Sequence, residues 1–490
     1  MTEASLKHKT IGALLWNLLD RTGQQVLLFI VGILVANILS VEDYALMGML
    51  AIFTALATIL IDSGFSIALI QRKEVTDIEY NSVFWFNLLT GCLLYGILVG
   101  ISPLIARFFH QPQLVELSWV VFLAIPLNAL SCIQSTLLNK HIQFKALTRS
   151  NLLAMSISGF SAFIMALTHC GVWTLAWQPV ILAGVKAALL WQQSTWRPQT
   201  QFSWTAIQSL FGFASSLLLA SLINTGFLHI YSVAIGTLYP IRQLGYYTQG
   251  NKMCDMGVSL LYSSIQNATL PIFSCVQDEH ERLIRLYRKT IRFTAFVTFP
   301  VMLGMMVTAD PLIQLLLKEK WWPTTPFLQW LCVGGCFTIL TAINNNFIKI
   351  SGRTDGILKI EYGKIALTIS LLYLTWQHTV LTMVIGLAVT RGLVYWINLY
   401  YTAQYTGYTI SMQLKDILPY AGIGLCMTAI IYPLRFFITS PLALIITQTI
   451  AGGIIYLGVA YLSGSSLLKE SIALMEGKFK RHKKTEKYEE

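Results

Sequence analysis

Long apolar segments recur along the whole chain, and their number and length constrain the fold more than any other feature. An α-helix needs about 20 predominantly apolar residues to cross a bilayer, so the sequence predicts about fourteen transmembrane spans. Only 12% of the residues are charged, whereas soluble domains average about 25%. We therefore expect an all-α membrane protein. The predicted spans lie near residues 10–39, 43–70, 83–108, 114–139, 148–169, 172–195, 207–236, 243–272, 285–309, 326–349, 357–377, 379–403, 415–436 and 440–463.

Lysine and arginine residues are concentrated in alternate connections between the spans, and this bias orients a membrane protein. With the N-terminus in the cytoplasm, the inner connections and the C-terminal tail hold most of the 34 basic residues. Both termini are therefore predicted to be cytoplasmic, and the first residues form a cytoplasmic cap and not a cleaved signal peptide. The net charge of +11 comes from basic residues in the short connections between spans, where they determine the topology. No nucleic-acid partner is therefore expected. The basic residues of the outer connections are only Arg107, Arg242, Lys318, Lys320 and Arg435.

No motif of a catalytic site or cofactor site stands out in the sequence. The eight cysteines lie in or beside apolar segments, which favours structural thiols over disulfides. Cys332 and Cys336 are close together, but their surroundings are apolar, so a metal site is not expected. Since a nucleotide-binding loop and a nucleophile motif are also missing, we expect neither an enzyme nor a cofactor.

A faint internal repeat divides the predicted spans into two halves. GISPLIARFF at the end of span three has a counterpart in TADPLIQLLL at the end of span nine. ANILSVEDYALMG and GTLYPIRQLGYYT, which follow spans one and seven, align with an offset of 200 residues. Parallel repeats of this kind build transporters that bind their substrate between two halves. The predicted parts are an N-lobe (1–196, spans 1–6), a C-lobe (197–410, spans 7–12), spans 13–14 (411–466) and a basic cytoplasmic tail (467–490).

Two spans carry a stripe of polar residues along one side of the helix. The stripe in span one consists of Asn17, Asp20, Arg21, Gln24 and Gln25. The stripe in span eight consists of Asn251, Lys252, Asp255, Ser259, Ser263 and Gln266. Such residues either form hydrogen bonds between helices or line a cavity. An ion pair between Lys252 and Asp255, three residues apart, is a further alternative.

Basic residues outnumber carboxylates deep in the predicted membrane region. At about 1.5 Å of rise per residue, Arg21, Lys252 and Arg391 lie near the bilayer midplane, whereas Lys186 and Lys364 lie nearer the inner face, where a long side chain snorkels. The surplus of positive charge is suited to a large anion. We expect a substrate-binding cavity lined by Asp20, Arg21, Gln24, Gln25, Lys252, Asp255 and Arg391. Arg72 and Lys73 are expected at its cytoplasmic mouth, unless they only determine the topology beside anionic lipids.

Several segments resemble one family of transporters. They are YALMGM, the run DSGFSIALIQRKEVTDIEYNSVFWFNLLTG (62–91), PLIARFF, WRPQTQFS (196–203) and LGYYTQGNKM (244–253). Together they are similar to Wzx-type oligosaccharide flippases of the lipopolysaccharide or colanic-acid branch, within the multidrug/oligosaccharidyl-lipid/polysaccharide (MOP) exporter superfamily. The chain departs from many members after span one, where it has Ala36-Asn37 in place of part of a Leu-Ala-Arg motif. The adjacent pair of Asp20 and Arg21 matches the family pattern.

The resemblance implies fourteen helices in two bundles, with a central cavity and alternating access. It implies a bacterial inner-membrane protein that moves an undecaprenyl-pyrophosphate-linked oligosaccharide, the repeat unit of an O-antigen, capsule or exopolysaccharide, to the outer leaflet. The partners are then this lipid-linked oligosaccharide and membrane lipids, with possible coupling to Na⁺ or H⁺. Alternatives are a cation-coupled multidrug exporter or lipid II flippase of the same superfamily. A membrane polysaccharide polymerase or glycosyltransferase is disfavoured, because no outer loop is long enough for a catalytic site.

Overall fold

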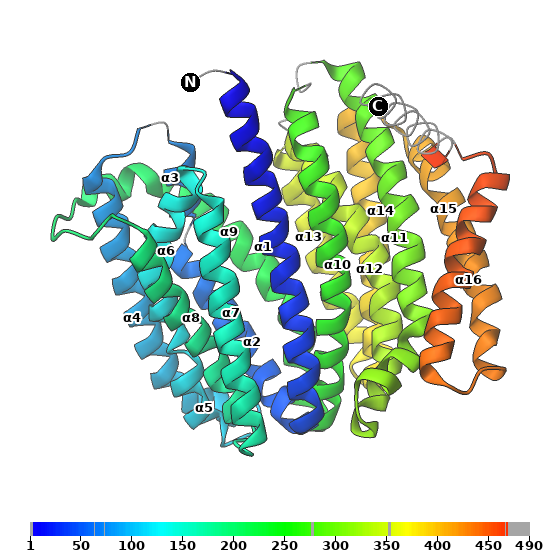
Figure 1. Cartoon of the computed structure of the whole chain (residues 1–490), viewed down its shortest axis with the longest axis horizontal. Helices are drawn as coiled ribbons and strands as arrows, with labels where there is room; N and C mark the ends of the chain where they lie inside the picture. The colour runs from blue at the N-terminus through cyan, green and yellow to red at the C-terminus, as the bar shows by residue number, and fades with distance from the viewer. Residues whose placement is uncertain are drawn as a thin grey trace, which may run out of the picture. The chain divides into compact units, whose positions relative to one another are not determined.

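The computed structural model describes residues 3–62, 64–72, 74–275, 279–350, 354–465 and 467–468. These residues form α-helices joined by short connections and two 3₁₀ turns, and no strand occurs among them (Figure 1). This confirms the predicted all-α fold class. Each predicted span falls on one long helix or on two consecutive elements, because each apolar segment satisfies its own backbone hydrogen bonds as a helix.

Twelve stretches in the described part of the chain are long and apolar enough to cross a membrane. The two other predicted spans coincide with helices α10 (Ile241–Cys275) and α13 (Thr354–Thr375), which are long enough but more polar. In α10 the polar stripe lowers the hydropathy, and α13 carries Lys359, Glu361 and Lys364. The predicted number of fourteen spans is therefore approximate, because the helices of two of these spans are less apolar than the others.

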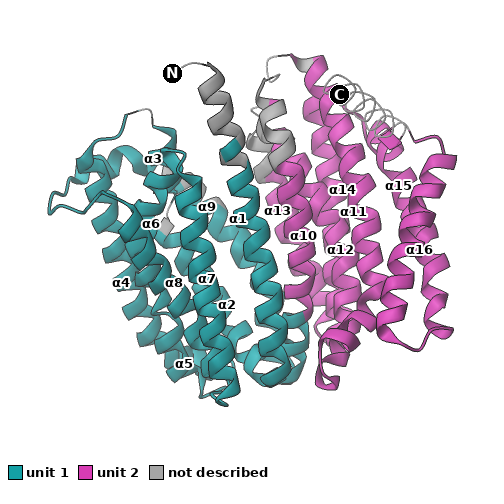
Figure 2. Ribbon diagram, in the orientation of Figure 1, with its two compact units in different colours: residues 1–249 teal, residues 250–490 magenta. Residues whose placement is uncertain are grey.

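The helices pack into two compact units, residues 1–249 and 250–490 (Figure 2). The boundary lies within α10, so this helix contributes its first turns to unit 1 and the remainder to unit 2. The lobes expected from the sequence repeat, residues 1–196 and 197–410, do not have the same bounds as these units. The division into lobes therefore stays a prediction. The other helices of unit 1 are α1 (Glu3–Ile38), α2 (Val41–Asp62), α3 (Phe65–Gln71), α4 (Asp77–Phe108), α5 (Leu114–Val121), α6 (Ala124–Lys140), α7 (Phe144–Leu167), α8 (Trp173–Gln193) and α9 (Trp204–Leu238).

Helix α1 packs against α7 in unit 1, and α7 also packs against α8. Glycines allow the close approach of α1 and α7: a Cβ atom on Gly23 would lie 2.8 Å from Leu152, and one on Gly159 would lie 2.6 Å from Val31. Small residues at such crossings give membrane helices the van der Waals contact that holds them together. This contact fixes which side of α1 faces α7.

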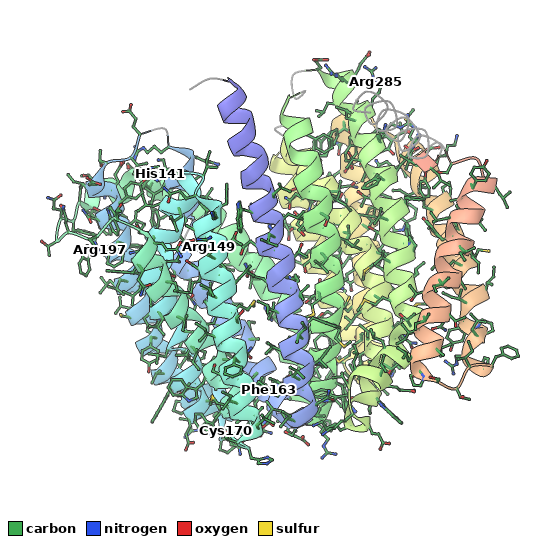
Figure 3. The ribbon with its side chains drawn as sticks, viewed as in Figure 1. His141, Arg149, Phe163, Cys170, Arg197 and Arg285 are labelled. Atoms are coloured by element: carbon green, nitrogen blue, oxygen red, sulfur yellow. The ribbon has the colours of Figure 1, made fainter. Side chains whose placement is uncertain are left out.

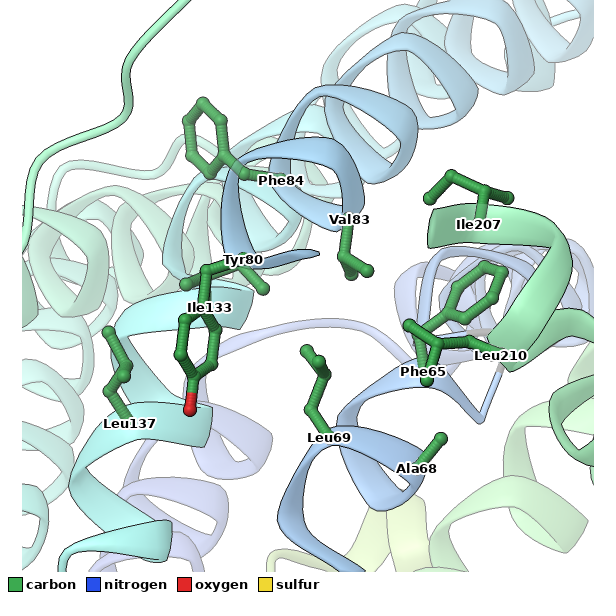
Figure 4. Packing of buried hydrophobic residues seen from close by; sticks show 10 residues of the cluster. All are labelled: Phe65, Ala68, Leu69, Tyr80, Val83, Phe84, Ile133, Leu137, Ile207 and Leu210. Carbon is green, nitrogen blue, oxygen red and sulfur yellow. The ribbon is translucent and has the colours of Figure 1, made fainter. Parts of the chain in front are cut away.

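A cluster of buried apolar side chains joins α3, α4, α6 and α9 at one end of unit 1 (Figure 4). Phe65 and Leu69 of α3 and Val83 of α4 have no exposed surface. These three residues belong to the run 62–91, on which the family resemblance depends most. The cluster consists of Phe65, Ala68, Leu69, Tyr80, Val83, Phe84, Ile133, Leu137, Ile207 and Leu210.

The first turns of α2 and α10 meet within unit 1. The side chains of Glu42 and Arg242 form an ion pair there. A Cβ atom on Gly48 would lie only 2.6 Å from the side-chain hydroxyl oxygen of Thr248, so the two helices approach each other closely at this position. The repeat alignment with its offset of 200 residues pairs Glu42 with Arg242 and Gly48 with Thr248. Counterpart residues of the two aligned segments are thus direct neighbours.

Unit 2 is centred on α11, which packs against α12, α15 and α16, while α14 packs against α12 and α13. Cys254, Cys332 and Cys336 are buried in this unit, and the cysteines whose side chains are described are all free thiols, as the sequence predicts. The remaining elements are α11 (His280–Leu316), η1 (Glu319–Thr324), α12 (Thr325–Ile350), α14 (Val380–Thr406), α15 (Ile410–Ile431), η2 (Tyr432–Phe436) and α16 (Pro441–Leu462).

Candidate functional site

The carboxylate of Asp20 on α1 is held by side chains from unit 1. It accepts a hydrogen bond from the Gln24 amide at 2.9 Å and two from the Asn151 amide on α7, at 3.1 and 3.3 Å. It also interacts electrostatically with Lys186 on α8. Because opposite charges lower the cost of burial, Lys186 and Asp20 compensate each other. Lys186 was expected to snorkel, and this stays a prediction beside its interaction with Asp20.

Arg21 is the next residue of α1, but it takes no part in this arrangement. Its side chain is exposed, and it has no hydrogen-bond or ion-pair partner among the described residues. Adjacent helical residues point about 100° apart, so the side of α1 that turns Asp20 toward α7 turns Arg21 away from it. Gln25, also on the predicted stripe, is half-buried. The positive charge of Arg21 is therefore left uncompensated within the described part of unit 1.

A second charged cluster lies in unit 2. Asp255 on α10 accepts a hydrogen bond from the Asn251 amide at 2.8 Å, and it interacts electrostatically with Arg391 on α14. Arg391 lies against Gly334 of α12, where a Cβ atom would come within 2.9 Å of its side chain. The structure thus brings Asp255 and Arg391 together, and Lys252 beside them is half-buried. A single cavity shared by the stripes of both units stays a prediction.

Arg72, one of the two residues predicted at the cytoplasmic mouth, belongs to a local network at the start of α4. Arg72 forms an ion pair with Glu79 and donates a hydrogen bond to the Ser209 hydroxyl at 3.3 Å. The backbone carbonyl of Arg72 accepts a hydrogen bond from the Lys140 ammonium at 2.9 Å. The guanidinium group of Arg72 therefore links the end of α3 to α4 and α9, and its backbone carbonyl links it to α6. Lys73 lies outside the described residues.

The basic first turns of α11 also have acidic partners, which sequence reasoning missed. Arg288 and Arg292 both bind Asp416 of α15, with N–O distances of 2.9 and 2.5 Å. The hydroxyl of Tyr408 donates to the same carboxylate at 2.5 Å. Burial and this hydrogen bond raise the pKa of Tyr408, so its hydroxyl stays protonated as a donor. One indication of this network is present in the sequence, because Asp416 is a single aspartate at the start of an apolar span.

Residues of three connections of unit 1 can be placed in Figure 3. Figure 3 shows His141 and Arg197, from two connections predicted to be cytoplasmic, toward one end of this unit, and Cys170 of a predicted outer connection at the opposite end. Among the described residues, no group of three or more His, Cys, Asp or Glu side chains could hold a metal ion. The charged clusters of the two units are thus the candidate sites for a polar substrate.

Comparison with known proteins identifies the family. The sequence profile of the family described as polysaccharide biosynthesis protein matches residues 34–326, which is more than half of the chain. The chain belongs to this family. The match contains the run 62–91 and the repeat-aligned segments at the starts of α2 and α10.

Curated members with similar sequences come from several bacteria. The chain is 25% identical over 347 residues to the teichuronic acid biosynthesis protein TuaB of Bacillus subtilis, covering 68% of this chain and 71% of that protein. It is 24% identical over 375 residues to the lipopolysaccharide biosynthesis protein WzxC of Escherichia coli, covering 74% of each. These relatives confirm the resemblance to Wzx-type proteins.

Solved structures show the same fold in this member of the polysaccharide biosynthesis family. The lipid II flippase MurJ, in an inward closed conformation, matches with a TM-score of 0.72 at 14% identity, over 95% of this chain and all of that chain. An inward-facing multidrug resistance MATE transporter of the MOP superfamily matches with a TM-score of 0.60 at 15% identity, over 81% of this chain and 96% of that chain. The protein is therefore a multi-pass membrane protein with a MOP-type transporter fold.

Proposed function

We propose that the protein is a flippase that moves an undecaprenyl-pyrophosphate-linked oligosaccharide from the cytoplasmic to the outer leaflet of a bacterial inner membrane. The family match over residues 34–326 carries this proposal. It agrees with relatives that are named for teichuronic acid and lipopolysaccharide biosynthesis and for succinoglycan transport in Rhizobium meliloti. Transport of a lipid-linked saccharide requires no catalytic step by the protein.

The chemistry of the substrate explains why charged residues lie within apolar helices. A pyrophosphate with attached sugars cannot cross hydrocarbon unaided, because its polar groups lose their hydration there. A protein must replace that hydration along the path. Arg21 is the residue best suited to bind the phosphate, since its guanidinium group offers a planar fork of donors and has no partner among the described residues.

The other predicted site residues have supporting roles in this proposal. Gln25 and Lys252 offer donors to phosphate or sugar oxygens. Asp20 with Gln24, and Asp255 with Arg391, form compensated groups whose hydrogen bonds can be exchanged with the substrate. Asp20 and Asp255 are also the carboxylates at which Na⁺ or H⁺ coupling would act. An inside-negative membrane potential favours exit of an anion by about 2.3 kcal/mol per charge per 100 mV.

A deletion strain tests the proposed function. Loss of the gene should cause lipid-linked oligosaccharide to accumulate in the cytoplasmic leaflet and surface polysaccharide to disappear, while sensitivity to cationic drugs stays unchanged. Radiolabelled lipid extraction, surface-glycan staining and drug inhibition assays measure the three quantities. A strain that becomes drug-sensitive with its surface glycan intact would show that the protein is a multidrug exporter instead.

A further inference from the structure

A cavity of about 570 Å³ opens at one end of unit 1, where three connections meet. It is lined by residues of the α3–α4, α6–α7 and α8–α9 connections and the helix ends beside them. All three connections are predicted to be cytoplasmic. The volume falls within the roughly 300–1,000 Å³ of small-molecule sites. None of the lining residues belongs to the polar stripes of spans one and eight, so this cavity is separate from the site considered above.

One wall of the cavity is aromatic and carries a tyrosine hydroxyl group. The rings of Tyr80 and Trp196 meet edge to face, with centroids 6.5 Å apart. Tyr80 is only 6% exposed, and its hydroxyl has no hydrogen-bond partner among the described residues. Figure 4 shows the Tyr80 ring extending from α4 toward Leu137 of α6, which also lines the cavity. The Tyr80 side chain lines the cavity, so its hydroxyl is available to form a hydrogen bond with a ligand there.

The rim of the cavity carries acceptors and donors but little available positive charge. Glu74, Asp77, Gln143 and Gln193 line it, and within the described part of the chain their side chains form no hydrogen bonds. The ammonium group of Lys140 is already bound to two backbone carbonyl groups at 2.9 Å. Two carboxylates repel a phosphate, so the rim does not fit the pyrophosphate of the proposed substrate.

We propose that this cavity binds sugar rings of the oligosaccharide on the cytoplasmic side, before the lipid-linked substrate is moved. A sugar ring presents an apolar C–H face to aromatic side chains and hydroxyl groups to carboxylates and amides, and this cavity offers both kinds of surface. The inference rests on the proposed function for the source of the sugar. The cavity then selects the glycan, while Arg21 binds the phosphate.

Titration calorimetry on the full-length protein in lipid nanodiscs tests the proposal. The probe is the repeat-unit oligosaccharide made by partial hydrolysis of the strain's own surface polysaccharide, which carries neither lipid nor phosphate. The wild-type protein should bind it. Tyr80→Phe removes one hydroxyl and keeps the ring packing, so it should weaken binding about 3- to 10-fold, the value of one hydrogen bond. Asp77→Asn on the exposed rim should weaken binding by a similar factor.

The controls separate this site from the proposed transport site. Tyr95→Phe lies on the same helix, and its hydroxyl bonds the Trp119 carbonyl at 3.2 Å outside the cavity, so it should bind the probe like wild type. Arg21→Ala should also keep its affinity for this phosphate-free probe. Wild-type affinity in both Tyr80→Phe and Asp77→Asn, or no binding by the wild-type protein, would overturn the sugar site.

The calorimetry tests the sugar site, and the deletion strain tests the flippase function, so the two proposals can fail separately. If the deletion strain accumulates lipid-linked oligosaccharide but the cavity variants bind the probe normally, the flippase function holds and the sugar site fails. If the deletion strain accumulates none, the proposed function fails, whatever the calorimetry shows. Loss of a co-purifying cytoplasmic protein from Asp77→Asn, with probe affinity unchanged, would assign the cavity to a protein partner and reject the sugar site.

Discussion

Arginine residues of α1 and of α11 have opposite surroundings, although both helices place arginine near a carboxylate. On α11, Arg288 and Arg292 are one helical turn apart and converge on Asp416, which lies more than a hundred residues later and is 4% exposed. On α1, Arg21 directly follows Asp20, yet Asp20 is bound by Asn151. Of these three arginines, Arg21 alone is adjacent in sequence to an acidic residue, and it has no partner among the described residues.

This difference separates charge that holds the fold together from charge that is available to a ligand. A carboxylate shared by two arginines and a tyrosine has little capacity left for other partners. Arg288 and Arg292 are therefore best explained as a link between α11 and α15. Arg21 keeps its donors available. The following variants test this distinction, in order of decreasing expected effect.

Arg21→Ala should abolish transport while the protein reaches the membrane in normal amount, because no contact within the described residues depends on this side chain. Arg21→Lys keeps the charge but loses the bidentate fork, so it should retain partial activity. Arg21→Gln should fail like alanine. Surface glycan measured in a complemented deletion strain, divided by the membrane abundance of the protein, gives the activity.

A structural role of Arg21 predicts another pattern. Abundance would then fall in all three variants, with the activity per molecule preserved. Full transport by Arg21→Ala would remove Arg21 from the proposed site.

Asp416→Ala should lower stability the most, since it leaves Arg288, Arg292 and the Tyr408 hydroxyl without their shared acceptor. Breaking a buried ion pair costs about 3–5 kcal/mol, and we expect the lower end, because both arginines are about one-third exposed. Thermal unfolding of the purified protein measures the loss. Asp416→Asn keeps an acceptor and should cost less, and equal stability of both variants with wild type would contradict the role of this link.

Lys186→Met should have an intermediate effect, because it removes the charge that compensates Asp20. Polar contacts between membrane helices are worth up to about 1–2 kcal/mol, so abundance should fall moderately. The double variant Asp20→Asn with Lys186→Met should recover stability, since no net charge then remains buried. If the double variant is less stable than either single variant, the two residues do not compensate each other.

Arg285→Ala should have the smallest effect. Its ion pair with Glu281, at 3.5 Å, is largely exposed, and such pairs contribute about 0–1 kcal/mol. Transport rate and membrane abundance should both stay near wild type. A clear decrease in the transport rate alone would show that the charge of Arg285 attracts the substrate.

The sequence predicted what depends on local pattern and missed what depends on distant neighbours. Apolar segments of sufficient length predicted the helices correctly, because each span forms its own backbone hydrogen bonds. The polar stripe of α1 was also predicted, because its residues recur with the spacing of one side of an α-helix. The hydrogen bonds from Asn151 to Asp20 join residues 131 positions apart, and Arg288 is 128 positions from Asp416. Without a homologous alignment or a structure, nothing in the spacing indicates such pairs.

The cavity beside Tyr80 was missed for the same reason. Its walls come from three connections that are distant in sequence, and each connection alone has the composition of an ordinary loop. The specific run 62–91 was interpreted only as a family signature. The structure gives part of this run a physical role, because Tyr80 and Val83 pack in the cluster that joins α3, α4, α6 and α9.

The ion pair between Glu42 and Arg242 has a consequence for how a chain with two similar halves can arise. In a homodimer of identical subunits, a residue on the twofold axis meets its own copy. A glutamate at this position would then face a glutamate, and an arginine would face an arginine, and both arrangements are repulsive. Opposite charges can meet at aligned positions only where the two copies have diverged. The Glu42–Arg242 ion pair is therefore possible between two diverged halves and impossible on the axis of a symmetric homodimer.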